Sequence, residues 1–170
     1  MIKGKGWVEA KILNLIVRRT EAGYEMEAGP RHAELIVEQV TRAGARTTTI
    51  PGNNMAKEGE DEKELGSEQA TQYRALAARC NYLSMDRPDM QFAVKEACRE
   101  MAKPTAGAWS RLERIGQYCK GRPRLILHFD WQSPVTVIDV YADANRAGCH
   151  RDRNTSGGGV RDEGSTWYKD

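Results

Sequence analysis

Three consecutive stretches between residues 68 and 120 place apolar residues at helical spacing, and this pattern constrains the possible fold more than any other feature of the sequence. Ser67 is positioned to cap the first helix, and Pro88 opens the second. Pro104-Thr105 marks the break before the third, which we expect to end near Lys120. The side chains expected in a shared core are Tyr73, Leu76, Ala77, Cys80, Leu83, Met90, Ala93, Val94, Ala97, Met101, Trp109, Leu112, Gly116 and Cys119. The sequence therefore predicts a three-helix unit over residues 68–124.

The first fifty residues have a different pattern. Residues 7–17 are largely apolar or β-branched, residues 21–23 form a turn signal and residues 24–27 alternate apolar with polar, which together predict a β-hairpin. Pro30 then opens a helix whose apolar face is Ala33, Ile36, Val37 and Val40, and Gly44 is placed to end it. Residues 51–67 contain a cluster of acids and almost no apolar side chains, which predicts a solvated linker.

The last part of the chain is expected to form strands. Residues 125–129 follow the helix-ending Gly121-Arg122-Pro123, and residues 135–142 follow Ser133-Pro134. The glycine run at 157–159 lacks the spacing of a nucleotide-binding loop and predicts a turn. The predicted fold class is therefore α+β, with a hairpin and helix over 1–50, a linker over 51–67, a helical unit over 68–124 and strands over 125–170.

Composition excludes several classes of function. The chain has 170 residues, 39% of them hydrophobic, and no apolar run near the length of about 20 residues that a membrane span needs, so no membrane partner is expected. Its start lacks the apolar core of a signal peptide, which favours a cytoplasmic or nuclear location. The four cysteines form no CxxC pair, so neither a zinc site nor a disulfide framework is indicated. The motifs of phosphate-loop, serine-hydrolase and zinc-protease chemistry are also missing.

A basic cluster at the end of the helical unit is the first candidate site. Its members are Lys103, Arg111, Arg114, Lys120, Arg122 and Arg124, and Glu113 is the only acid among them. A helical wheel places Arg111, Arg114 and Tyr118 on an outer face, where a ring beside guanidinium groups could stack on a base or sugar. Such a face suits a phosphate backbone. The alternative is that these residues simply form the solvated face of an amphipathic helix.

Asp143 is the second candidate, because it ends the predicted strand 135–142 and could hold a magnesium ion at a sheet edge. The alternative is a turn residue, since one acid alone makes no metal site. Asp139 lies on the same face but about 13 Å away at strand rise, too far to share a small metal site. Asp152, Asp162 and Glu163 lie in loop-like sequence and are not assigned as ligands.

The order of short motifs resembles copia-type retrotransposon polyproteins. The segments that carry the resemblance are YRALAARCNYLSMDRPDMQFAVKEACREMAKPTAGAW, RLERIGQYCKGRPRLILHF and YADANRAGCHRDRNTSGGGV, and the N-terminal hairpin with PRHAELIVEQV is similar to the segment that follows the polymerase palm. The resemblance implies the end of a reverse transcriptase, with a thumb-like helical unit, joined to the first strands of a truncated RNase H-like fold. Asp143 then corresponds to the first metal-binding aspartate of RNase H, which uses magnesium in the parent family.

Departures from the family limit the expected activity. The Tyr-x-Asp-Asp motif of the polymerase is missing, and the chain stops before the later RNase H carboxylates. Asn145, Arg146 and Gly158 replace residues usual in the family, which suggests a decayed or domesticated copy. We expect a polyprotein fragment that needs no cofactor, performs no catalysis by itself and at most binds a template-primer duplex, with the remainder of the polyprotein as its other partner. The alternative is a non-functional relic or structural interaction module, and a working magnesium nuclease would require further carboxylates.

Overall fold

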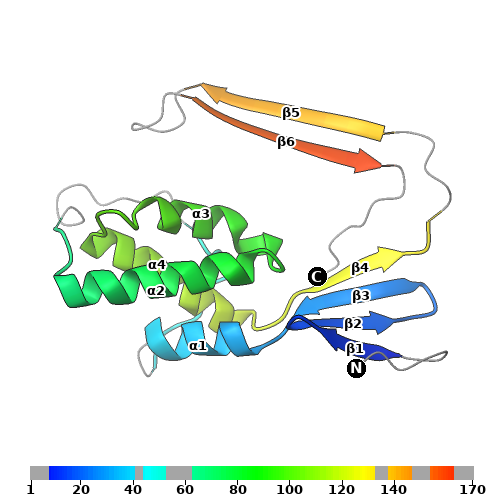
Figure 1. Cartoon of the computed structure of the whole chain (residues 1–170), viewed down its shortest axis with the longest axis horizontal. Helices are drawn as coiled ribbons and strands as arrows, with labels where there is room; N and C mark the ends of the chain where they lie inside the picture. The colour runs from blue at the N-terminus through cyan, green and yellow to red at the C-terminus, as the bar shows by residue number, and fades with distance from the viewer. Residues whose placement is uncertain (1–7, 41–43, 53–62, 133–137, 147–153, 163–170) are drawn as a thin grey trace.

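The computed structural model of the protein describes residues 8–40, 44–52, 63–132, 138–146 and 154–162. The strands are β1 (Glu9–Ile12), β2 (Leu15–Arg19), β3 (Gly23–Ala28), β4 (Ile126–Asp130), β5 (Ile138–Arg146) and β6 (Asn154–Asp162). The helices are α1 (Arg31–Val40), α2 (Ser67–Ser84), the 3-10 helix η1 (Pro88–Met90), α3 (Gln91–Arg99) and α4 (Ala106–Gly121). Helices and strands occupy separate parts of the molecule (Figure 1), so the predicted α+β class is confirmed.

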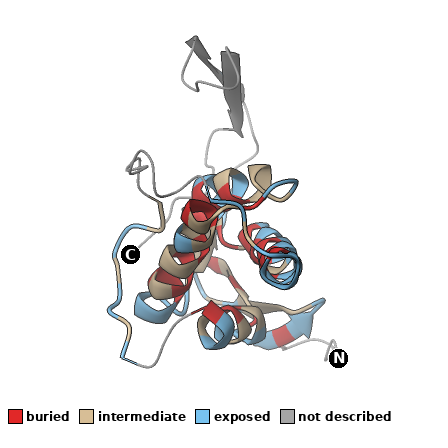
Figure 2. Cartoon of the chain, turned by 90° about the vertical axis from the view of Figure 1, so that its left-hand side faces the viewer, coloured by how far each residue is buried: buried red, intermediate tan, exposed pale blue. Residues whose placement is uncertain are grey.

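The four α-helices share one hydrophobic core, and the predicted apolar stripes supply it. Tyr73, Ile36, Leu112 and Ile115 are each 0% exposed at its centre, and most of the buried residues lie in the helices (Figure 2). Burial of side chains of this size stabilises a fold by about 1.5–3 kcal/mol each. The predicted cap at Ser67 is wrong by one position, because Gly66 is the N-cap and Ser67 is the first helical residue. The prediction that Pro88 opens the second helix of the helical unit is confirmed, because η1 begins at Pro88 and leads directly into α3.

The N-terminal segment forms three strands, one more than the predicted hairpin. Residues 7–17 do not form one strand, because the chain reverses at Leu13 and Asn14, where φ is 47° and 69°. Two consecutive positive φ angles are typical of the tight turns that join antiparallel strands, and asparagine tolerates this conformation better than most residues. The sequence pattern did not predict this turn, because the apolar residues on both sides of it resemble one continuous strand.

β4 joins this sheet from the far end of the chain. The strand order is β1-β2-β3-β4, and β4 pairs antiparallel with β3, for example Met26 with Leu127. The resemblance places residues 125–170 at the start of the RNase H-like unit, and β4 lies within that range. In the structure β4 completes the N-terminal sheet, so the chain returns from α4 to its own beginning.

The register gives this sheet two unlike faces. One face carries charged residues, including Glu9, Arg18, Glu25, Glu27 and His128. The other face is apolar and consists of Ala10, Ile12, Leu15, Val17, Tyr24, Met26, Ala28, Leu127 and Phe129, with Arg19 at its end. The sheet extends away from the helices (Figure 1), and among the described elements no helix packs along either face.

β5 and β6 form a separate two-stranded antiparallel sheet. The predicted strand at 135–142 is present over 138–146, whereas residues 133–137 lie outside the described part of the chain. The predicted turn at Gly157, Gly158 and Gly159 is wrong, because these residues lie within β6 and pair with Asp143, Ala142 and Tyr141. Of these two strands only β5 was expected from the sequence, and the assignment to a truncated RNase H-like fold stays a prediction.

Candidate nucleic-acid interface

Helix α4 is buried on two sides, so part of the face that was predicted to be outer and basic lies in the interior. Its core residues include Ala108, Leu112 and Ile115, and it packs against α1, α2 and α3. Tyr118 is only 3% exposed. The helical-wheel prediction that Tyr118 lies on an outer face is therefore wrong, because a wheel that assumes one buried side cannot represent a helix enclosed by three others.

Tyr118 belongs to a buried polar network centred on Arg87. The Tyr118 hydroxyl donates to Asp89 Oδ2 at 2.8 Å, and Arg87 Nη2 donates to the same oxygen at 2.7 Å. Burial and the hydrogen bond to Asp89 raise the pKa of Tyr118. Burial opposes the charged form of Arg87, but the hydrogen bonds and charge of Asp89 outweigh it and raise the pKa of the guanidinium. Arg87 and Asp89 therefore form a buried ion pair.

The same arginine holds the chain where it leaves α4. Arg87 Nη2 donates to the carbonyl oxygen of Arg122 at 3.1 Å, and Arg87 Nη1 donates to that of Pro123 at 3.5 Å. Arg87 is only 1% exposed, so these bonds are made in the interior. The Arg87-Pro88-Asp89 motif thus fixes the start of the basic loop at 122–124 relative to helices α2 and α3.

Arg111 and Arg114, the other two members of the predicted face, are half-buried. Arg111 Nη2 lies 3.9 Å from Glu100 Oε1, and the Nε atoms of both arginines are buried without a hydrogen-bond partner. Their guanidinium groups therefore lie at the margin of the packed helices. The prediction that they contact nucleic acid stays a prediction.

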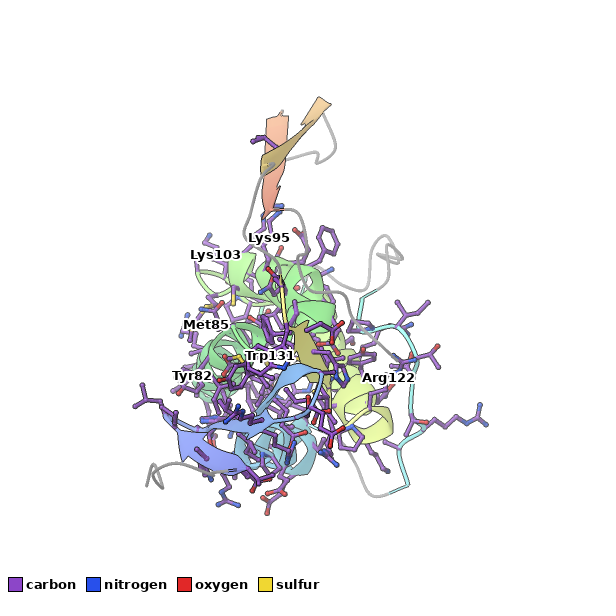
Figure 3. The ribbon with its side chains drawn as sticks, turned by 90° about the vertical axis from the view of Figure 1, so that its right-hand side faces the viewer. Tyr82, Met85, Lys95, Lys103, Arg122 and Trp131 are labelled. Carbon is purple, nitrogen blue, oxygen red and sulfur yellow. The ribbon has the colours of Figure 1, made fainter. Side chains whose placement is uncertain are left out.

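Lys103 lies at the opposite end of α4 from the remaining bases. It is 82% exposed and its Nζ is 4.0 Å from Glu64 Oε1. The sixteen residues of α4 separate it from Arg122 by roughly 24 Å at 1.5 Å per residue, and Figure 3 shows the two side chains on different sides of the helical unit. The six predicted bases thus do not form one continuous patch.

Two segments that carry exposed cations meet at the C-terminal end of α4, and we call Arg46, Lys120, Arg122 and Arg124 the exit cluster. Lys120 Nζ donates to the carbonyl oxygen of Ala45 at 2.9 Å, which brings the backbone next to Arg46 against the end of α4. The close approach of Gly121 to Thr47, where an added Cβ would lie 3.1 Å from the threonine Cβ, fixes the same segment. Sequence reasoning missed Arg46, because only the tertiary fold places it beside residues 120–124.

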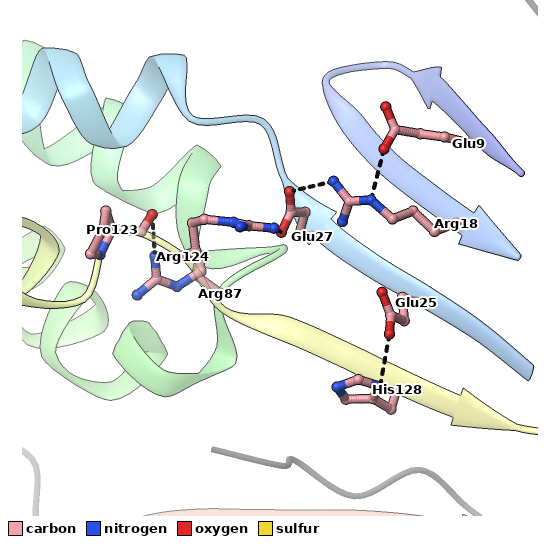
Figure 4. A network of polar contacts seen from close by, with 8 residues as sticks. All are labelled: Glu9, Arg18, Glu25, Glu27, Arg87, Pro123, Arg124 and His128. Carbon is pink, nitrogen blue, oxygen red and sulfur yellow. Dashed lines mark hydrogen bonds and ion pairs between the residues drawn. The ribbon is translucent and has the colours of Figure 1, made fainter. Parts of the chain in front are cut away.

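Arg124 is partly neutralised within the cluster. Its Nη2 contacts Glu27 Oε2 at 2.6 Å, while Arg18 contacts the other oxygen of Glu27 at 3.0 Å and also binds Glu9 (Figure 4). Burial alone would raise the pKa of Glu27, but the hydrogen bonds from Arg18 and Arg124 outweigh it and lower that pKa. Arg124 therefore ties β4 to the sheet, and part of its charge is compensated by Glu27.

Asp143 lies in β5 opposite Gly157, and nothing in the described part of the chain completes a metal site around it. The structure describes its backbone position but not its side chain, and Asp152 and Glu163 fall outside the described residues. No group of three or more His, Cys, Asp or Glu residues that could hold a metal occurs among the residues described. The assignment of Asp143 to a magnesium site therefore stays a prediction, and no chemistry is derived through it. No helix in the described residues is long and apolar enough to cross a membrane.

Comparison with known proteins gives three relatives, all from Arabidopsis thaliana. An uncharacterised mitochondrial protein is 30% identical over 86 residues, which is 51% of this chain and 35% of the relative. Retrovirus-related Pol polyproteins from transposons RE2 and RE1 are each 32% identical over 78 residues, which is 46% of this chain and 5% of each polyprotein. No family model and no solved structure matches.

These matches extend over about half of the chain, whereas the chain spans about a third of the mitochondrial protein and a small part of each polyprotein. They agree with the motif series, in which no single motif is decisive but the order is. The predicted resemblance is thereby confirmed: about half of the chain is similar to a segment of the retrovirus-related Pol polyproteins from transposons RE2 and RE1.

Proposed function

We propose that the chain is a polyprotein fragment that binds a nucleic-acid duplex through its phosphates, without catalysis of its own. The observation that carries the proposal is the exit cluster, which groups four exposed cations from two distant segments at one end of α4. Lysine and arginine at this density neutralise phosphates without reading base sequence. Its relation to Pol polyproteins makes a template-primer duplex the natural partner.

Lys120 and Arg122 are both expected to contact phosphates. Arg122 is exposed, and Lys120 uses one of its three N–H donors on a carbonyl oxygen, which leaves its charge uncompensated. Arg124 shares its charge with Glu27. Two to three phosphate contacts predict a slope of about −2 to −3 when the logarithm of the binding constant is plotted against that of salt concentration.

The test is fluorescence anisotropy of a labelled RNA/DNA duplex at several salt concentrations. The double variant Lys120→Glu/Arg122→Glu should weaken binding and flatten the salt slope. The matched control is Lys95→Glu/Lys103→Glu, which makes the same change in charge at two exposed lysines of the helical unit outside the exit cluster. Equal effects of the two double variants, or binding insensitive to salt, would show that no specific interface exists at the exit cluster.

A second candidate function is a structural interaction module without a nucleic-acid role. The observation that favours it is the apolar face of the β1–β4 sheet. No described helix packs along this face, and Ile12 in β1 is 42% exposed and Val8 just before β1 is 69% exposed. Exposed apolar patches commonly mark protein contacts. Sedimentation velocity on the isolated chain tests it: Val17→Glu should abolish concentration-dependent association, and a monomer at all concentrations removes support for this candidate.

A further inference from the structure

An aromatic cluster at the end of the apolar sheet face lies apart from the exit cluster. Trp131 follows β4 directly, is 54% exposed and contacts the Tyr24 ring edge-on at 5.0 Å. Tyr24 is paired across the strands with Phe129 on one side and Arg19 on the other, so all these side chains share one face. The Arg19 guanidinium lies 6.0 Å from the centre of the Trp131 ring.

The Trp131 ring is held in place although much of its surface is exposed. Its indole Nε1 donates to the carbonyl oxygen of Glu21 at 2.9 Å, and its backbone N–H donates to that of Ala22 at 2.8 Å. Both acceptors lie in the turn that precedes β3. An exposed aromatic ring fixed in this way loses little freedom on binding, which is the property of a preorganised contact surface.

We propose that Trp131, with Tyr24 and Arg19, is a stacking site for an unpaired base of single-stranded nucleic acid. Every base has a π-face, and an aromatic ring beside a guanidinium group combines stacking with a cation that faces the backbone phosphate. Glu21 and Asp130 are exposed nearby, so the phosphates must pass on the side of Arg19. The inference goes beyond the proposed function, because it concerns unpaired bases and a different face of the molecule.

The position of β4 relates the two sites. Arg122 and Arg124 precede this strand and Trp131 follows it, and Figure 3 shows Arg122 and Trp131 at separate places on the surface. The seven residue steps from Arg124 to Trp131 span about 23 Å at strand rise. A duplex bound at the exit cluster could therefore present a single-stranded overhang of several nucleotides to the stacking site.

The α3 surface offers a matched comparison. Phe92 is 66% exposed and Lys95 Nζ lies 5.6 Å from the centre of its ring, so it is also an exposed aromatic beside a cation. It lies on a single helix, and no second aromatic ring contacts it among the described residues. If exposure and a nearby cation were sufficient, Phe92 would bind a base as well as Trp131 does.

The test compares two probes, a ten-nucleotide thymidine oligonucleotide and a blunt duplex, by anisotropy at moderate salt. Trp131→Leu should weaken binding of the single strand about 5- to 150-fold, the range for loss of one stacked base, and leave duplex binding unchanged. Trp131→Phe, which retains an aromatic ring, should restore much of the affinity, and Phe92→Leu should change neither probe. Circular dichroism confirms that each variant is folded.

Several results would overturn the inference. One is that the wild type does not bind the single strand. Another is that Trp131→Leu leaves the affinity for the single strand unchanged, or that Phe92→Leu lowers this affinity equally. A Trp131→Leu variant that changes only self-association would assign the apolar face to a protein partner instead. Because duplex binding is measured separately, failure of the stacking site and failure of the exit cluster give different results.

Discussion

Asp89→Asn should destabilise the fold more than its partial exposure suggests. The Asp89 side chain is 16% exposed, but its partner Arg87 has a side chain that is 2% exposed and donates three hydrogen bonds to the carboxylate, at 2.7, 3.0 and 3.2 Å. Asparagine keeps the shape of the side chain and one acceptor oxygen but removes the charge. Arg87 would then be a buried cation without its counter-ion.

The expected cost can be worked from these contacts. Removing one partner of a buried ion pair costs about 3–5 kcal/mol, because the remaining charge is left uncompensated. Asparagine can still accept one hydrogen bond from either Arg87 or Tyr118, so we expect about 3 kcal/mol. This is a large fraction of the 5–15 kcal/mol that separates typical folded and unfolded states.

The measurement is urea unfolding followed by circular dichroism at pH 7. With a slope of about 2 kcal/mol/M, a loss of about 3 kcal/mol lowers the midpoint by about 1.5 M. The matched control is Asp86→Asn, three residues earlier. Burial raises the pKa of Asp86, so the fold disfavours its charged form, and removing that charge should not lower the midpoint.

An Asp89→Asn midpoint within about 0.3 M of the wild type would refute this reasoning. So would a shift no larger than that of Asp86→Asn. Either result would mean that solvent reaches Arg87 well enough to replace the carboxylate. The network would then not fix the loop at 122–124.

Three further predictions concern other parts of the fold. The pKa of Glu27 is lowered from 4.5, so the stability that this carboxylate contributes is present above pH 4.5 and is lost as pH falls through the lower folded-state pKa. The urea midpoint should therefore drop more steeply below about pH 4.5 in the wild type than in Glu27→Gln. Parallel pH profiles of the two proteins would contradict this. Gly23→Ala should separate β3 from β4, since its Cβ would overlap the carbonyl oxygen of Phe129; hydrogen exchange should show lost protection in β4, and unchanged protection would disprove the clash. Burial raises the pKa of Cys119 to about 11, so iodoacetamide at pH 8 should modify this thiol only in urea; mass mapping that finds equal labelling of the native chain would show that the thiol is accessible.

The sequence by itself determined the helices of this protein and its relation to Pol polyproteins. Residues such as Leu76, Val94 and Leu112 recur at helical spacing, and this local periodicity survives whatever the helices pack against. The ordered motifs led to the same family that the comparisons support. Both conclusions rest on information that is local or linear along the chain.

Only the tertiary structure decided which side chains are accessible. Tyr118 is buried because α4 is enclosed by three helices, and Arg124 is neutralised by Glu27, a residue 97 positions away. Arg46 joins Lys120 and Arg122, whereas Lys103 does not, because the chain folds one segment against the C-terminal end of α4. A run of charged residues in the sequence shows how much charge a segment carries. Which of these side chains are exposed and lie together depends on contacts between residues that are distant in sequence, and no local sequence pattern encodes those contacts.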